Sequence, residues 1–284
     1  MCIRDRAQSV KLEYVAKMYE ILSNYVDFPE FNVPKIEFIG NDDPLEMDSP
    51  EVMAEIEKIA NHIRESWELG RGPIKNLQFI LEEHGIVITG FQLNESKIDA
   101  FSQRIHMKNG ATIFIIALAL GSKPKERLNL DIAHELGHIL LHPWGESIDL
   151  IDKAEFNGRE KQANMFASAL LLPKETFGED IKMYPTDLAY YQFMKRKWKM
   201  SIQAMMYRAR QLDIITMNQY QYMICLLYTS PFFYRCRVLE EEFRFRKIGV
   251  AQCGGICVRG GRRNSGIHRN GCGIYCWDFC SDRT

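Results

Sequence analysis

The sequence predicts an α+β fold, because its helical and strand-like patterns are grouped and do not alternate. Amphipathic patterns fill the N-terminal part, three short apolar runs follow, and two long apolar helical patterns come next. Strands that alternated with helices would instead indicate a parallel α/β sheet. The body of the chain, residues 7–224, is long enough to form one hydrophobic core.

Helix signals in the N-terminal part are separated by loop signals. We expect three helices there, at Val10–Tyr25, Ser49–Trp67 and Ile74–His84. Phe28–Pro50 is an acidic segment with four prolines and is expected to be a loop. Ser49 suits an N-cap, and Pro50 suits the first helical position. Gly70–Pro73 should then separate the second helix from the third.

A small sheet and two buried helices are expected next. Three β-branched or apolar runs lie between polar or glycine-containing turns, at Ile86–Phe91, Lys97–Gln103 and Thr112–Leu120. A helix from about Glu126 should carry an apolar stripe and stop before Pro143. A second buried helix is expected at Arg159–Leu172, and Pro185–Leu212 should form a helical C-terminal part.

The first buried helix contains an HExxH motif, His134-Glu135-Leu136-Gly137-His138. Histidines four positions apart lie about one turn apart on the same helix face, so both imidazoles can reach one Zn²⁺ ion. The carboxylate of Glu135 can then act on a metal-bound water. The apolar helix around the motif favours a metal site over two histidines that merely pack or face solvent.

A catalytic zinc site needs a third protein ligand. Glu160 is a candidate, and Asn164 shares its face one turn later, where it could hydrogen-bond a metal ligand. From spacing alone, Glu160 could equally be a solvated glutamate in the first turn of its helix. His142 continues the four-residue spacing, but one straight helix cannot wrap three turns around an ion. A capping role, or a hydrogen bond to a ligand, suits His142 better.

Composition restricts the partners of the body. Residues 7–224 contain 24 Lys or Arg and 31 Asp or Glu, which argues against a nucleic-acid surface on this part. No cysteine lies in the body, so a disulfide framework is excluded there. The longest apolar run, at Ala111–Leu120, is too short to span a membrane, and we expect no membrane partner.

The two ends of the chain resemble translations of one oligonucleotide. TGTCTCTTATACACATCT encodes Cys225–Ser230, and its reverse complement contains codons for Met1–Asp5 and the start of an arginine codon. We therefore expect residues 1–6 and 225–284 to be non-native, adaptor-derived or spurious sequence. The alternative for the tail is a small zinc knuckle of Cys253, Cys257, Cys272 and Cys276.

Two motifs resemble the ImmA/IrrE family of metallopeptidases. Residues 134–142 read HELGHILLH, and residues 160–173 fit the pattern ExxANxFAxxLLxP. Further similar segments extend the resemblance to about Ala60–Leu212, namely Trp67–Gly70, Gly72–Ile74, Leu81–Ile86, Ile98–Ser102, Ile113–Leu120 and Trp198–Ala209. The resemblance implies a small zincin-like metallopeptidase domain at residues 73–224, after a helical connector at residues 7–72.

The resemblance also implies roles for individual residues. His134, His138 and Glu160 would hold Zn²⁺, and Glu135 would be the general base. Tyr207 and Arg208, in the C-terminal motif-like helix, are candidate donors to the oxyanion of the transition state. The alternative for both is ordinary packing or surface pairing.

Family members are associated with cleaving or inactivating helix-turn-helix repressors. The resemblance therefore implies a cytoplasmic zinc endopeptidase whose protein substrate is such a repressor. One alternative is an XRE-type transcriptional regulator whose metallopeptidase-like domain is a sensor or interaction module. Another is a toxin–antitoxin or phage-type partner that acts by protein contact. Many relatives carry an N-terminal helix-turn-helix domain, and residues Lys11–Pro34 resemble the connector after it. Nucleic acid would be bound only through that domain, which we expect to have preceded residue 7.

Overall fold

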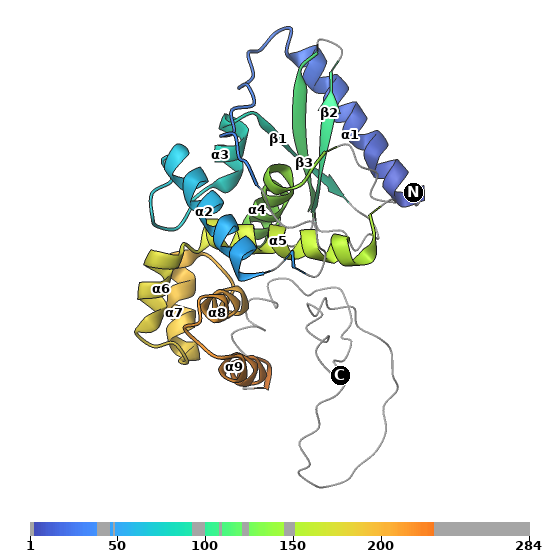
Figure 1. The fold of residues 1–284 in the computed structure, drawn as a ribbon. Helices are drawn as coiled ribbons and strands as arrows, with labels where there is room; N and C mark the ends of the chain where they lie inside the picture. The colour runs from blue at the N-terminus through green and yellow to red at the C-terminus, as the bar shows by residue number, and fades with distance from the viewer. Residues whose placement is uncertain are drawn as a thin grey trace, which may run out of the picture. The chain divides into compact units, whose positions relative to one another are not determined.

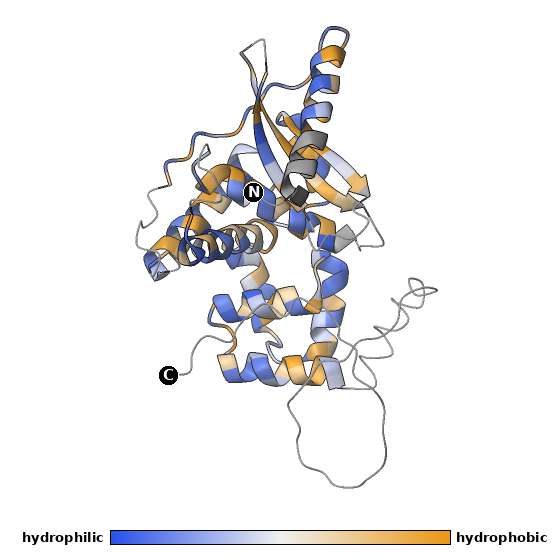
Figure 2. Ribbon diagram, turned by 90° about the vertical axis from the view of Figure 1, so that its right-hand side faces the viewer, coloured by the Kyte–Doolittle hydropathy of each residue, from blue (hydrophilic) through white to orange (hydrophobic). Residues whose placement is uncertain are grey.

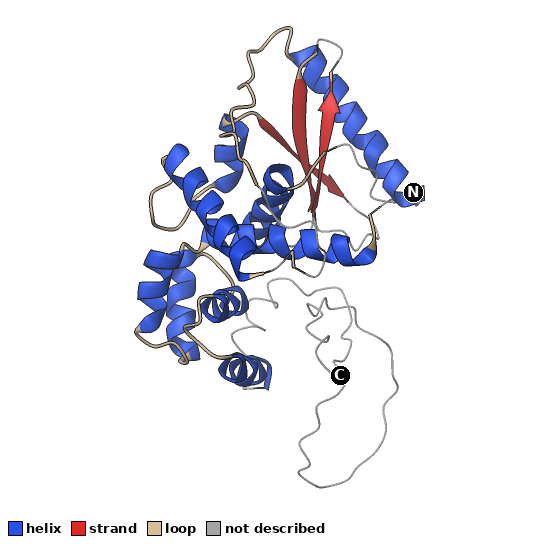
Figure 3. Cartoon of the chain, viewed as in Figure 1, coloured by secondary structure: helices blue, strands red, loops and turns tan. Residues whose placement is uncertain are grey.

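A three-stranded mixed sheet is central to the fold (Figure 3). The computed structural model describes residues 3–38, 46–47, 49–92, 100–107, 110–120, 125–144 and 151–229. The strands are β1 (Ile86–Gln92), β2 (Ala100–His106) and β3 (Thr112–Leu120), in the spatial order β1-β3-β2. The central strand β3 is parallel to β1 and antiparallel to β2. Together with the helices described below, this sheet confirms the predicted α+β fold.

Strand β3 is apolar along its length because helices cover both of its faces. Alternate residues of a strand point to opposite faces. On one face, Ile115 packs in a cluster with Leu12 and Ala16 of α1 (Ile3–Leu22), which lies along the sheet in Figure 1. On the other face, Ile116 is the register partner of Ser102, whose hydroxyl contacts α4 (Lys125–Leu141). The sheet is therefore the middle layer between α1 and α4.

Of the two helices just before the sheet, one has the predicted N-cap and the other begins later than predicted. Helix α2 (Pro50–Ser66) has Ser49 as its N-cap, and the Val52 amide donates to the Ser49 hydroxyl at 3.4 Å. Helix α3 (Leu77–Glu83) begins three residues later than predicted, because the Asn76 side chain caps it. Both helices bury apolar residues on one side, and Figure 2 shows orange and blue faces along the helices.

Helices α4 and α5 (Lys153–Leu171) are packed closely against each other. A Cβ atom at Gly137 would lie 3.0 Å from the Ala163 Cα and 3.1 Å from its carbonyl oxygen. Glycine at this position of the HExxH motif therefore lets the backbone of α5 approach the face that carries the two histidines. Ala163 and Phe166 are fully buried at this contact.

The start of α5 differs from the prediction. The helix begins at Lys153, six residues before Arg159, because the Asp152 side chain accepts a hydrogen bond from the Glu155 amide at 2.8 Å. Glu160 therefore lies beyond the first turn, and the interpretation as a solvated first-turn glutamate is wrong. Strand β2 also begins at Ala100, and the predicted start at Lys97 falls outside the described residues.

In the described part of the chain after α5, the helices are α6 (Lys174–Lys182), α7 (Leu188–Trp198), α8 (Ile202–Gln211) and α9 (Met217–Thr229). The Trp198 indole donates to Asp180 at 2.8 Å and so joins α7 to α6. Within the described residues, no helix is both long and apolar enough to cross a membrane.

Candidate metal centre

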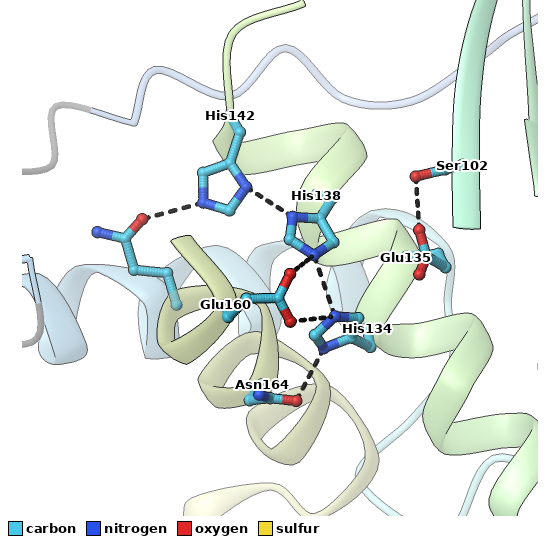
Figure 4. A network of polar contacts seen from close by, with 8 residues as sticks. Ser102, His134, Glu135, His138, His142, Glu160 and Asn164 are labelled. Carbon is cyan, nitrogen blue, oxygen red and sulfur yellow. Dashed lines mark hydrogen bonds and ion pairs between the residues drawn. The ribbon is translucent and has the colours of Figure 1, made fainter. Parts of the chain in front are cut away.

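Helices α4 and α5 bring His134, His138 and Glu160 to one point (Figure 4). The two histidines come from successive turns of α4, and the glutamate comes from the facing side of α5. Among the described residues, these three form the group that could hold a metal ion, with ligand atoms all within 4.8 Å of one another. The local spacing on α4 and the close approach at Gly137 together create the site.

The distances fit a tetrahedral metal ion. The Nε2 atoms of His134 and His138 are 3.0 Å apart. Glu160 places Oε1 at 3.2 Å from the His138 Nε2 and Oε2 at 3.4 Å from the His134 Nε2. Tetrahedral zinc with bonds of about 2.0–2.1 Å separates its ligand atoms by about 3.3 Å. Two imidazoles and a carboxylate are also a donor set that suits zinc.

One side of the group is open. The side chains of His134 and His138 retain 17% and 19% of their exposure, and that of Glu160 retains 37%. A structural zinc site is closed by four protein ligands, whereas a catalytic site keeps one position for water or substrate. Three converging ligands with partial exposure therefore match the catalytic arrangement.

Hydrogen bonds on the far side of each ring orient the two histidines. The His134 Nδ1 lies 2.8 Å from the Asn164 Oδ1, and the His138 Nδ1 lies 2.9 Å from the His142 Nδ1. The Nε2 atom of each ring is thereby directed toward Glu160. Asn164 and His142 thus lie where a hydrogen bond to a ligand was predicted, and His142 does not join the three-residue group.

The surroundings shift the pKa values of three of these groups. Burial alone would raise the pKa of Glu160, but hydrogen bonds from His134 and His138 outweigh burial and hold the pKa well below its usual range. For His134, burial lowers the pKa, but contact with Glu160 and the nearby charge of Glu135 leave it raised overall. Burial lowers the pKa of His142 to about 3, so this ring is neutral.

We expect zinc affinity to fall as the pH is lowered through the pKa of His134. A raised pKa means that a proton competes with the metal for this imidazole, whereas Glu160 stays ionised because its pKa is lowered. Apparent affinity should drop by about tenfold for each pH unit below the His134 pKa. Competition with a chromophoric chelator at several pH values measures this slope. A flat profile across the titration range of histidine would contradict it.

Glu135 is held from the sheet. This residue is only 6% exposed, and its Oε2 accepts a hydrogen bond of 2.6 Å from the Ser102 hydroxyl of β2. Figure 4 shows Glu135 on α4 beside the histidines, with its carboxylate turned toward Ser102. The Ser102 hydroxyl therefore fixes one oxygen of Glu135, the predicted general base. No spacing in the sequence indicates this pair, because Ser102 precedes Glu135 by 33 residues.

Arg208 and Tyr207, the candidate oxyanion donors, have partners elsewhere in the fold. Arg208 is fully buried, and its guanidinium binds both carboxylate oxygens of Glu57 at 2.6 and 2.8 Å and the Leu172 carbonyl at 2.9 Å. The Tyr207 ring packs edge-on against Tyr220. These contacts are the packing and pairing that the alternative interpretation described. Residues 230–284 of the tail, including the alternative cysteine knuckle at residues 253–276, lie outside the described residues.

A family model, one solved structure and the curated proteins were compared with this chain, and the family model agrees with the metallopeptidase motifs. One solved structure that matches is a Mycobacterium tuberculosis transcriptional regulator, with 16% identity and a TM-score of 0.38 over 55% of this chain and 46% of that chain. The chain thus spans less than half the length of that protein. No curated protein matches. Residues 81–210 match the IrrE N-terminal-like domain, Peptidase_M78, and include His134, Glu135, His138 and Glu160. This part of the chain is therefore similar to the IrrE N-terminal-like domain family, Peptidase_M78.

Proposed function

We propose that this protein is a zinc-dependent endopeptidase. The observation that carries the proposal is the convergence of the His134 Nε2, the His138 Nε2 and the Glu160 carboxylate at separations of 3.0–3.4 Å. Three electron-pair donors so close together favour a shared cation. Glu135, held by Ser102 on the same helix as the histidines, adds a carboxylate beside that point.

The residues of the site divide the work of peptide hydrolysis. A zinc ion bound there would lower the pKa of a water molecule and polarise the scissile carbonyl. Glu135 would accept the proton of that water and return it to the leaving amine. Ser102 holds one oxygen of Glu135 and so fixes the direction of the carboxylate. Asn164 orients His134 by the hydrogen bond at its far nitrogen.

We further propose that the substrate is a regulatory protein of the helix-turn-helix repressor class. Support for this class comes from the resemblance to a family whose members act on such repressors. Repressors encoded beside the gene for this chain are the first proteins to test.

A peptide library tests the proposal for any substrate sequence. Peptides from a digested cell lysate are incubated with the purified full chain, first loaded with zinc, then stripped by a chelator and finally reloaded. Mass spectrometry should find new termini with the loaded and reloaded protein only, and metal analysis should find about one zinc per chain. No new termini from zinc-loaded protein would overturn the endopeptidase proposal and favour the sensor interpretation. Unchanged cleavage after stripping would overturn the zinc dependence.

A further inference from the structure

A line of hydrogen bonds connects the candidate metal centre to the backbone carbonyl of Met47. The His138 Nδ1 lies 2.9 Å from the His142 Nδ1, and the His142 Nε2 lies 3.0 Å from the Gln162 Oε1. The Gln162 amide nitrogen then donates to the Met47 carbonyl at 2.9 Å. Figure 4 shows His142 next to His138 on the side away from Glu160. Gln162 lies two residues after the candidate ligand Glu160, and the sequence motifs assign no role to it.

The direction of every bond in this line follows from its last member. A carbonyl oxygen only accepts hydrogen bonds, so the Gln162 atom facing Met47 must be the amide nitrogen. The Gln162 oxygen therefore faces His142 and accepts from the His142 Nε2–H. A neutral imidazole carries one N–H, so the His142 Nδ1 is an acceptor. The proton between the two rings then belongs to the His138 Nδ1, and the His138 Nε2 keeps its lone pair.

We propose that Gln162 and His142 are positioning residues that hold His138 in the tautomer whose Nε2 can bind a metal ion. The inference rests on the metal site of the proposed function and adds how one ligand is prepared for it. A neutral histidine that instead carried its proton on Nε2 would present a hydrogen to the metal, not a lone pair. The hydrogen bonds exclude that tautomer. The His142 Nδ1 can only accept a hydrogen bond, so the proton must lie on the His138 Nδ1.

Gln162, the middle residue of these hydrogen bonds, is shielded from solvent. Gln162 is only 2% exposed, so water does not readily replace its two partners. The Met47 side chain packs over Gly158, where an added Cβ would lie 2.4 Å from the Met47 sulfur. This glycine lets the segment at residues 46–47 lie against α5, which places the carbonyl within reach of Gln162. Helix α5 therefore supplies one candidate ligand, Glu160, and two orienting amides: Asn164 bonds to His134 directly, and Gln162 acts on His138 through His142.

Nitrogen NMR of the unmodified full chain tests the tautomers directly. The chain has seven histidines, so ring ¹⁵N signals can be assigned by single substitutions. In metal-free protein at a pH of about 8, above the ordinary imidazole pKa, we expect His142 to carry its proton on Nε2 and His138 on Nδ1. A proton on the His142 Nδ1 or the His138 Nε2 would overturn the proposal, whether or not zinc binds.

Substitutions at His142 separate the hydrogen bond from simple packing. His142→Phe keeps a ring but offers no acceptor, and zinc affinity should fall by about 10–100-fold. His142→Asn restores an oxygen near the position of the Nδ1 atom and should keep most of the affinity. Equal affinities for the two variants would contradict the proposal. Gln162→Leu, farther from the metal, should release the His142 tautomer and also weaken binding. If the expected tautomers are found but the unmodified chain binds no zinc, the metal site fails and the tautomer assignment stands.

Discussion

The Glu135→Gln variant is expected to bind zinc as the unchanged chain does and to cleave its substrate about 10²–10⁴-fold more slowly. Glutamine is close in shape to glutamate and can still accept the 2.6 Å hydrogen bond from the Ser102 hydroxyl. The amide cannot, however, take a proton from a metal-bound water. Because Glu135 is not one of the three converging ligands, loss of its charge should affect the rate far more than the metal content.

Two measurements on the same preparation check this expectation. Metal analysis gives the zinc content, and mass spectrometry of the peptide library gives the rate at which new termini form. Glu51→Gln, at an exposed position in the first turn of α2, is the matched control and should match the unchanged chain in both. A Glu135→Gln variant that cleaves at the normal rate would remove Glu135 from the mechanism. Loss of zinc from that variant would instead place Glu135 among the ligands.

Local patterns predict the part of the site that lies on one helix. The spacing of His134 and His138 is a property of α4 alone, so the sequence is sufficient to place both rings on one face. Spacing leaves the role of Glu160 open, because that role depends on how α5 packs against Gly137. The true start of α5 does have a signal in the sequence, since Asp152 followed by Glu155 has the pattern of an N-terminal capping box.

The supporting residues could not be predicted, because they come from distant parts of the chain. Ser102 reaches Glu135 only after β2 pairs with β3 and α4 covers that face. Gln162 of α5 contacts His142, which follows the last residue of α4. The Met47 carbonyl accepts a hydrogen bond from Gln162, which lies 115 residues later in the chain. Contacts of this kind depend on tertiary packing and leave no periodic trace in the sequence.

Two buried arginines bind the C-terminal end of α5, the helix that carries Glu160. The last carbonyls of a helix lack partners within it. The Arg64 guanidinium donates to the Leu170 carbonyl, and the Arg208 guanidinium donates to the Leu172 carbonyl. Burial lowers the pKa of Arg64 to about 10, so the side chain stays charged at neutral pH. Positive charge at this end of a helix is favourable.

Arg208→Met is therefore expected to lower the free energy of unfolding by about 3–5 kcal/mol, because it leaves a carboxylate in a poorly solvated position. Glu57 is that carboxylate, and its side chain is only 14% exposed in contact with Arg208. The Leu172 carbonyl would also lose its donor. Urea unfolding followed by circular dichroism measures the change.

A substitution of Glu57, the ion-pair partner of Arg208, distinguishes a structural role of Arg208 from a role in catalysis. Glu57→Met should also destabilise the fold, and the double variant should be more stable than the sum of the single losses predicts, since no charge is then left unpaired. An oxyanion donor would behave differently, because its removal would slow cleavage without any coupling to Glu57. Additive losses in unfolding free energy, together with a large fall in cleavage by folded Arg208→Met protein alone, would return Arg208 to the active site. Coupled losses with zinc binding intact in the folded variants would place Arg208 in the support of α5.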